Sequence, residues 1–221
     1  MSNIFLSIVG LIAAYLLGSI SSAVWVARTF HGINIREHGS GNAGATNILR
    51  VLGPKAALPV FAFDFLKGLL AIQFVRFIPD FSPLENPELY TGYEIALGIC
   101  VVLGHIFPLF ASFKGGKGVA TIAGALVAIS PGPMLIALGV FLITFLITKY
   151  VSLGSIMAAI TFPLIVIFLY GMVLRPDTTT NTLKVFSVIA SAMIIITHRK
   201  NIRRLREGTE SKISFKKKEK E

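Results

Sequence analysis

The chain has 221 residues, of which 54% are apolar and 14% are charged, and its mean hydropathy is +0.75. Because a soluble domain carries about 25% charged residues, this composition excludes an ordinary soluble protein and indicates an integral membrane protein. The net charge of +10 does not indicate a nucleic-acid-binding protein, since that class carries its basic surface on a water-soluble module. The single cysteine, Cys100, excludes an internal disulfide.

Seven apolar stretches are candidates for membrane-spanning helices, and we predict an all-α polytopic membrane protein with about seven transmembrane helices. Three of the stretches are shorter than the roughly 20 residues that cross a hydrocarbon core, so the expected range is five to seven spans. In chain order they are residues 4–26, 51–77, 92–113, 119–130, 133–148, 151–174 and 183–196.

The positions of Lys and Arg predict the orientation, because cytoplasmic loops hold an excess of both. With seven spans, the first, third and fifth loops and the C-terminal tail are basic, whereas the loop around residues 80–88 holds three acids and no base. We therefore expect the N-terminus outside and the C-terminus in the cytoplasm. Since no internal repeat or linker is visible, residues 1–210 are predicted to form a single membrane-embedded catalytic domain, followed by a basic, frayed tail over residues 211–221.

The first loop contains the sequence GSGNAGATNILR over residues 39–50. Its small residues allow backbone amides to approach a ligand closely, which favours a phosphate site. If Thr46 or Asn47 capped the next helix, the free amides of that helix would add to the site, with Arg50 one turn later. The sequence also matches the dinucleotide fingerprint G-x-G-x-x-G, which we reject because that motif needs a strand, helix, strand unit. A glycine-rich connector needed only for tight turns is the alternative.

The third loop contains FKGGKGVAT over residues 113–121, with two lysines around three glycines immediately before an apolar stretch. This pattern favours a second anion site. It is not a Walker loop, because Gly118 rather than Ser or Thr follows Lys117. The alternative is that Lys114 and Lys117 only satisfy the positive-inside rule, which explains the lysines but not the glycines.

The tail opens with THRKNIRRL over residues 197–205. If the last span continues as a helix, His198 and Asn201 share one face and the basic residues spread around the others. A basic amphipathic helix that binds anionic lipid headgroups is the alternative. Within the second span, Asp64 and Lys67 stand at i and i+3 and are expected to pair.

These three clusters lie on one side of the membrane by the charge argument, so they can converge on two phosphorylated ligands or on one ligand with two phosphates. That arrangement favours an enzyme of lipid metabolism. Loops one, three and five contain a single acid, Glu37, and so lack the acidic pairs that hold Mg²⁺. We therefore predict no metal, no cofactor and no nucleic-acid partner. The alternatives are a membrane transporter or scramblase for phosphorylated solutes or lipids, or a lipid-binding scaffold.

The chain resembles the bacterial acyl-phosphate-dependent glycerol-3-phosphate acyltransferase family of integral membrane proteins. The resemblance covers nearly the whole chain and rests on GSGNAGATNILR, on GHIFPLFASFKGGKGVAT over residues 104–121 and on HRKNIRRLREGTE over residues 198–210. It implies transfer of a fatty acyl group from acyl phosphate to the 1-hydroxyl of sn-glycerol 3-phosphate, giving lysophosphatidic acid and inorganic phosphate. It also implies a multi-pass protein of the bacterial cytoplasmic (inner) membrane, surrounded by membrane lipids, with its active site facing the cytoplasm.

The resemblance implies that the catalytic residues are Ser40, Arg50, Lys114, His198 and Asn201. The substrate-binding residues expected in the two glycine loops and the fifth loop are Gly39, Gly41, Asn42, Gly44, Thr46, Asn47, Gly115, Gly116, Lys117, Gly118 and Ser152. Arg50 and Lys114 are suited to neutralise phosphate oxygens. His198 is either a general base or a hydrogen-bond partner of phosphate or hydroxyl, and the sequence does not decide between these roles.

Overall fold

The computed structural model describes residues 2–79, 81–175 and 179–212, so most of the predicted tail over residues 211–221 lies outside the described residues. All the regular secondary structure of the described part is helical. The N-terminal half contains α1 (Ser2–Gly18), α2 (Ser22–His31), η1 (Ile35–Glu37), α3 (Ala45–Leu52), α4 (Pro54–Ile72), η2 (Gln73–Phe77) and α5 (Pro87–Ile106).

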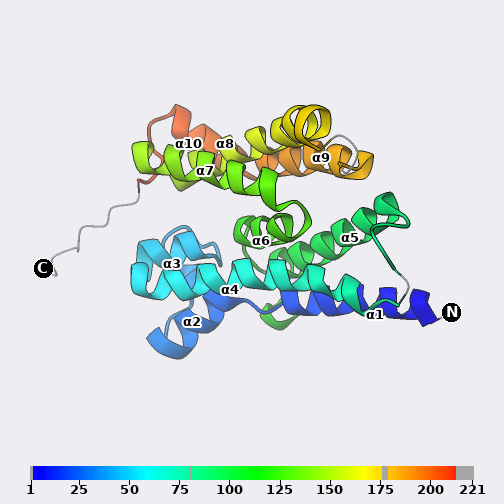
Figure 1. Ribbon diagram of the computed structural model, residues 1–221. Helices are drawn as coiled ribbons and strands as arrows, with labels where there is room; N and C mark the ends of the chain where they lie inside the picture. Colours follow the sequence, from blue (N-terminus) through cyan, green and yellow to red (C-terminus); the bar gives the residue numbers. More distant parts are fainter. Residues whose placement is uncertain (1, 80, 176–178, 213–221) are drawn as a thin grey trace, which may run out of the picture.

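The C-terminal half contains η3 (Leu109–Ala111), α6 (Val119–Ile129), α7 (Pro131–Thr148), α8 (Val151–Leu164), the π-helix η4 (Ile165–Leu174), α9 (Asn181–Thr197) and α10 (Arg199–Arg206). In Figure 1 the helices α7 to α10 form one layer, α1 to α5 form the other, and α6 lies between them. α4 packs on α6, α7 on α8, and α1 on α5.

Within the described residues, five helical stretches are long and apolar enough to cross a membrane, and α9 with α10 forms a sixth candidate that is bent by 57°. α6 has 11 residues, a length of about 16 Å, which is roughly half the hydrocarbon thickness. The predicted polytopic all-α fold is confirmed. The count of seven spans and the orientation of the termini stay predictions. The five stretches are Asn3–His31, Pro54–Phe77, Pro87–Ala111, Pro131–Thr148 and Val151–Leu174.

Close contact between α4 and α6 depends on two glycines. A Cβ atom on Gly68 would overlap the carbonyl of Thr121, and a Cβ atom on Gly124 would overlap the carbonyl of Phe65. Small residues at such positions let two membrane helices approach at backbone distance. The contact holds the first turns of α6, which directly follow the glycine loop of residues 115–118, against the middle of α4.

The first predicted span contains a break between α1 and α2, and the charged pair of the second span lies beside it. Nζ of Lys67 is 2.9 Å from Oδ1 of Asp64 and donates to the carbonyl of Ile20, also at 2.9 Å. Ser22 donates from Oγ to the same Asp64 oxygen at 2.9 Å. The predicted Asp64–Lys67 pair is therefore confirmed, and it satisfies a carbonyl that the helix break would leave without a hydrogen bond.

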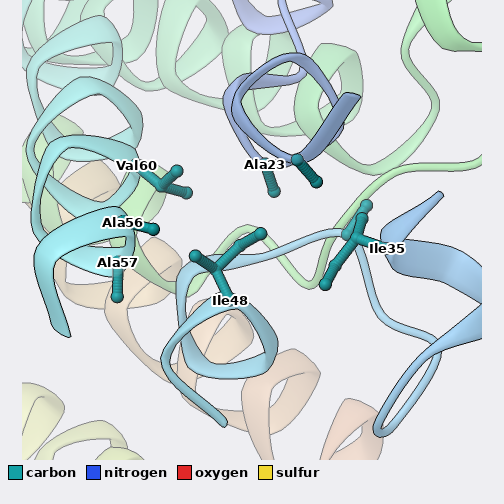
Figure 2. Close-up of a cluster of buried hydrophobic side chains, with 8 residues drawn as sticks. Ala23, Ile35, Ile48, Ala56, Ala57 and Val60 are labelled. Atoms are coloured by element: carbon teal, nitrogen blue, oxygen red, sulfur yellow. The ribbon is translucent and has the colours of Figure 1, made fainter. Parts of the chain in front are cut away.

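A cluster of buried apolar side chains fixes the elements on either side of the first loop (Figure 2). It joins Ala23 of α2, Ile35 of η1 and Ile48 of α3 to the N-terminal half of α4. Because η1 precedes the glycine-rich segment and α3 follows it, burial of Ile35 and Ile48 holds both ends of that segment in place. The residues labelled in Figure 2 are Ala23, Ile35, Ile48, Ala56, Ala57 and Val60.

The segments that carry the predicted clusters gather at one end of the molecule. α2, α3 and α10 lie at that end in Figure 1, whereas the N-terminus lies at the opposite end. Hydrogen bonds described below connect the first loop to the third loop, and the third loop to the segment after α9. The three clusters therefore lie at the same end of the helices, and their place on the cytoplasmic side of the membrane stays a prediction.

Candidate active site

Asn47 determines the shape of the first loop. Its side chain is buried, and its Oδ1 accepts a hydrogen bond from the backbone amide of Ser40 at 2.8 Å. Its Nδ2 donates to the carbonyls of His38 at 2.9 Å and Ile35 at 3.2 Å. These bonds leave Ser40 exposed at the loop surface. Asn47 thus uses its amide to hold the loop around Ser40.

The helix after this loop begins earlier than the sequence suggested. α3 starts at Ala45, and its N-cap is Gly44, which offers no side-chain cap. The expectation that Thr46 or Asn47 caps the helix is therefore wrong, because both lie within its first turn. Arg50 lies in the last turn of α3 and is exposed.

The glycine loop of residues 115–118 lies against the C-terminus of α5. Gly115 donates its amide to the carbonyl of Ile106 at 3.0 Å, and Gly116 donates to the carbonyl of His105 at 3.2 Å. These two amides are therefore engaged within the protein. Gly118 has φ +75°, a conformation that favours glycine, and directly precedes α6. The first amides of α6 have no acceptor within their own helix and are available to an anion.

Arg36 joins the first loop to the third. Its guanidinium donates from Nη2 to the carbonyl of Ala111 at 2.8 Å and also to the carbonyl of Lys114. The Lys114 side chain itself is exposed. In the sequence, Arg36 is only one of the basic residues of a predicted cytoplasmic loop. A single arginine beside a glycine-rich motif carries no signal that it binds backbone carbonyls 75 and 78 positions away.

A polar centre joins the third loop, α8 and the tail. Lys117 donates from Nζ to Oδ1 of Asn201 at 2.7 Å. The Nδ2 of Asn201 donates to Oε1 of Glu210 at 2.9 Å, and the hydroxyl of Ser152 donates to the same oxygen at 2.8 Å. The predicted residues Lys117, Asn201 and Ser152 therefore meet, and we call them with Glu210 the polar centre.

Glu210 is the member of the polar centre that sequence reasoning did not assign. Its Oε2 accepts a hydrogen bond from Nε of Arg204 at 2.6 Å, so three residues donate to one carboxylate. Burial raises the pKa of the Glu210 carboxyl, but hydrogen bonds from Arg204, Asn201 and Ser152 outweigh it and hold the pKa below its usual value. The signal in the sequence was weak, because Glu210 is one of two acids, with Glu207, inside a strongly basic run.

Positive charge concentrates around Lys117. Burial, followed by the charge of Arg204, lowers the pKa of the Lys117 ammonium, and the charges of Arg50 and Lys200 act in the same direction. The charge of Glu210 acts in the opposite direction. Cations that repel one another in this way form a site for an anion, since a bound phosphate would offset the repulsion. Arg50 from the first loop and Lys117 from the third thus contribute to one electrostatic site.

His198 lies between α9 and α10, where the chain bends, and is 3% exposed. Its Nδ1 is 2.8 Å from the carbonyl of Ile194. Because a carbonyl only accepts, Nδ1 carries the proton in the neutral ring and Nε2 presents a lone pair. Burial lowers the pKa of the His198 imidazole, and the charge of Lys117 lowers it further. The hydrogen bond to Ile194 and the charge of Glu210 oppose this shift without reversing it, so the surroundings favour the neutral ring.

The structure brings some of the predicted site residues into hydrogen-bonding contact and leaves others without side-chain hydrogen bonds near the surface. Lys117, Asn201 and Ser152 are linked by hydrogen bonds through Glu210, and His198 lies within range of the charge on Lys117. Among the described residues, no hydrogen bond holds the side chains of Ser40, Asn42, Thr46, Arg50 or Lys114. Within the described ranges, no group of three or more His, Cys, Asp or Glu residues is placed to hold a metal ion.

The fold and this centre define an integral membrane protein with a cluster of cations at one end of its helices. The glycerol-3-phosphate acyltransferase family matches residues 8–208 of the chain. A glycerol-3-phosphate acyltransferase of Chlorobaculum parvum is 44% identical, covering 91% of this chain and 94% of the relative. One of Thermoanaerobacter sp. strain X514 is also 44% identical, covering 93% and 94%. The chain belongs to the glycerol-3-phosphate acyltransferase family.

Two solved structures agree with this assignment. The chain is similar to the crystal structure of PlsY (YgiH), an integral membrane glycerol 3-phosphate acyltransferase, in its glycerol 3-phosphate form, with a TM-score of 0.78 and 37% identity. The match covers 97% of this chain and 96% of that one. The lysophosphatidic acid form of the same enzyme gives a TM-score of 0.75. The resemblance stated from the motifs is therefore confirmed, including the integral membrane character.

Proposed function

We propose that the protein transfers a fatty acyl group from acyl phosphate to the 1-hydroxyl of sn-glycerol 3-phosphate. The products are lysophosphatidic acid and inorganic phosphate, and the reaction is the first step of phospholipid synthesis. The observation that carries the proposal is that Lys117, which is partly buried and hydrogen-bonded to Asn201, lies within range of the charges of Arg50, Lys200 and Arg204. Two phosphorylated substrates and a phosphate product need concentrated positive charge, which these cations provide.

The proposed reaction needs no further activation of the donor. The 1-hydroxyl oxygen attacks the carbonyl carbon of acyl phosphate, a new C–O ester bond forms, and the C–O bond to phosphate breaks. The hydroxyl proton ends on the released phosphate. The protein must therefore place the hydroxyl, stabilise the oxyanion and hold the departing phosphate. Lys117 and Arg50 are suited to the phosphates, with Lys114 and Ser40 at the exposed edge of the site.

His198 is suited to orient the attacking hydroxyl. Its Nε2 lone pair can accept a hydrogen bond from that hydroxyl, because Nδ1 is committed to the carbonyl of Ile194. Burial and the charge of Lys117 disfavour an imidazolium, so we assign the final proton to the phosphate rather than to His198. Asn201 acts by holding the ammonium of Lys117.

An apolar groove beside the polar centre suits the acyl chain. Its volume is about 450 Å³, and it lies between α8, α9 and α10. Leu153 and Ile202 in its wall directly follow Ser152 and Asn201 of the polar centre, so the groove begins next to the proposed reaction site. The lining residues are Leu153, Ile156, Ile160, Ile195, Ile202, Leu205 and Arg206.

We place the protein in the bacterial cytoplasmic (inner) membrane with this end of the helices facing the cytoplasm. Support comes from the basic loops that gather there and from the water-soluble substrate, which must reach the site. The proposed catalytic residues remain Ser40, Arg50, Lys114, His198 and Asn201, and the structure adds Glu210 as the residue that positions Asn201.

A donor comparison tests the proposal. Purified protein in detergent would receive glycerol 3-phosphate with palmitoyl phosphate, palmitoyl-CoA or palmitoyl-acyl-carrier protein, and the lipid product would be identified by mass spectrometry. We expect lysophosphatidic acid with palmitoyl phosphate and none above background with the other two donors. Product formed from palmitoyl-CoA but not from palmitoyl phosphate would overturn the donor assignment. No product with any donor from monodisperse protein would favour the transporter interpretation.

A further inference from the structure

A group of buried polar side chains lies beneath the glycine loop and is not used by the proposed reaction. Asp64 is 2% exposed and Lys67 1%, and Ser22 and His105 are also buried. Nδ1 of His105 is 3.5 Å from Oδ1 of Asp64, its charged neighbour. Ion pairs and polar groups at such depth cost free energy that an apolar core would avoid. Their position inside a membrane protein therefore indicates a functional constraint.

His105 forms the wall against which the glycine loop packs. Its carbonyl accepts the amide of Gly116, and the next carbonyl along α5 accepts the amide of Gly115. A Cβ atom on Gly116 would overlap Nε2 of the His105 ring and would lie 2.8 Å from the carbonyl of Ala43 in the first loop. The imidazole thus lies at the junction of the two loops, in direct contact with the residue before Lys117.

The other edge of the ring faces Asp64. Among the described residues Nδ1 of His105 has no hydrogen-bond partner, and the carboxylate at 3.5 Å is fixed by Ser22 and Lys67. An ionised carboxylate only accepts, so it favours the tautomer with the proton on Nδ1 and the lone pair on the side of Gly116. The ring therefore lies between a fixed carboxylate and the glycine loop.

We propose that His105 is a positioning residue for the substrate phosphate, held by Asp64 and acting through Gly116 on the neighbouring Lys117. The ring determines how far the loop lies from the first loop and thus where the ammonium of Lys117 meets the phosphate. Moving that cation by about 1 Å would weaken the interaction strongly, since misplacement of this size can change rates by about a hundredfold. The inference rests on the proposed function, in which Lys117 and this loop hold a substrate phosphate.

The test uses a double-variant cycle that follows from the two glycine contacts. Gly116→Ala should raise KM for a phosphorylated substrate in the native background, because the new methyl group meets the imidazole. In the His105→Ala background the imidazole is gone and only the 2.8 Å approach to the carbonyl of Ala43 remains, so the same change should raise KM by a clearly smaller factor than in the native background. Independent sites would instead give equal factors in the two backgrounds. His105→Ala alone should raise KM by about tenfold to a hundredfold, with kcat within about threefold of wild type.

Gly115→Ala is the matched control for the cycle. Its methyl group would overlap the carbonyl oxygen of His105, which substitution of the side chain does not remove. The KM penalty of Gly115→Ala should therefore be the same in both backgrounds. Tyr93→Phe controls for stability, because it removes a hydrogen bond of 2.8 Å from the other end of α5 to Ser7 and should leave both KM values unchanged.

The outcomes separate this inference from the proposed function. Equal penalties of Gly116→Ala in both backgrounds, or wild-type KM values for both substrates in His105→Ala, would overturn the role of His105. Unchanged KM values in Lys117→Ala would instead overturn the proposed phosphate site. If His105→Ala does not yield monodisperse protein, His105→Gln replaces it. It should give a KM between wild type and the expected Ala value, and a wild-type KM there would also count against the inference.

Discussion

Lys117 donates a hydrogen bond of 2.7 Å to Asn201, a residue 84 positions further along the chain. This bond joins the glycine loop before α6 to the helix after the bend at His198. It also distinguishes the two lysines of the loop, because Lys114 is exposed whereas Lys117 is partly buried within the polar centre. The cation most directly placed to hold a phosphate is therefore Lys117.

Substitution of the two lysines should have different consequences. Hydrogen bonds to charged groups contribute about 1.5–3 kcal/mol, so we expect Lys117→Ala to lower kcat/KM by about tenfold to more than a hundredfold. Lys114→Ala should act mainly on KM, by about tenfold or less, because water screens its exposed charge. Steady-state kinetics with both substrates checks this. Lys55→Ala, which removes another exposed lysine, serves as the control. A larger loss in Lys114→Ala than in Lys117→Ala would contradict the assignment.

His198 offers a test of how the hydroxyl proton is handled. We expect His198→Ala to lower kcat by about a hundredfold or more, within the range measured for a lost proton-transfer or orienting group. His198→Gln should recover part of this loss, because its carboxamide oxygen can still accept a hydrogen bond. The pH profile of kcat provides the second measurement. Two results together would show that His198 is a base. The glutamine variant would be as inactive as the alanine variant, and the fall in kcat at acid pH seen in wild type would be absent from the variants.

Glu210 should determine the stability of the contact between α8 and α10. Glu210→Gln replaces a carboxylate that accepts three side-chain bonds, and we expect a loss of about 1–3 kcal/mol together with a raised KM. The pKa of Glu210 is lowered by folding, so its stabilisation is present above the unfolded pKa and is lost as pH falls through the lower folded value. The difference between variant and wild type should therefore shrink at acid pH.

Thermal unfolding in detergent at neutral and acid pH measures this effect. Glu207→Gln is the matched control, because Glu207 pairs with Arg203 at 2.8 Å on the exposed side of α10. Exposed pairs of this kind contribute about 0.2–1 kcal/mol at most. Equal melting temperatures for the two variants would show that the polar centre does not depend on the Glu210 carboxylate.

The lowered pKa of Lys117 predicts an alkaline limit on activity. Burial and the neighbouring cations favour the neutral amine, so the ammonium is lost at a lower pH than for an ordinary lysine. We expect kcat/KM to fall as pH rises through that value. Lys117→Arg should move the fall to higher pH, since the guanidinium stays charged. The rate of spontaneous acyl phosphate hydrolysis must be subtracted at each pH. If kcat/KM fell at the same alkaline pH in wild type and in Lys117→Arg, the loss of activity would not be due to Lys117.

Much of the site could be predicted because its residues carry strong patterns. The glycine loops, the run of cations and the positive-inside distribution predict that Lys117, Ser152 and Asn201 lie on one side of the membrane. The spacing of Asp64 and Lys67 likewise predicted a pair that the structure contains. Such features depend on local spacing and on the energetics of charge in a membrane.

The rest depends on contacts between distant segments. Asn47 looked like a ligand or a cap, yet its carboxamide satisfies three backbone groups of the loop before it. Glu210 lies in a basic run that also contains Glu207, and no spacing distinguishes the two acids. The three donors to Glu210 come from two different helices. The bend at His198 interrupts a stretch that is helix-compatible in sequence. The break after Gly18 did carry a local signal, since residues 18–22 read GSISS, but the length of the surrounding apolar run favoured one continuous span.

The most direct test of the central claim is phosphate release from palmitoyl phosphate by the purified protein, with and without glycerol 3-phosphate, in the presence of EDTA. Release that depends on glycerol 3-phosphate, matched mole for mole by lysophosphatidic acid, is the result we expect. Phosphate release that is independent of glycerol 3-phosphate, or none from monodisperse protein, would contradict acyl transfer from acyl phosphate at this site.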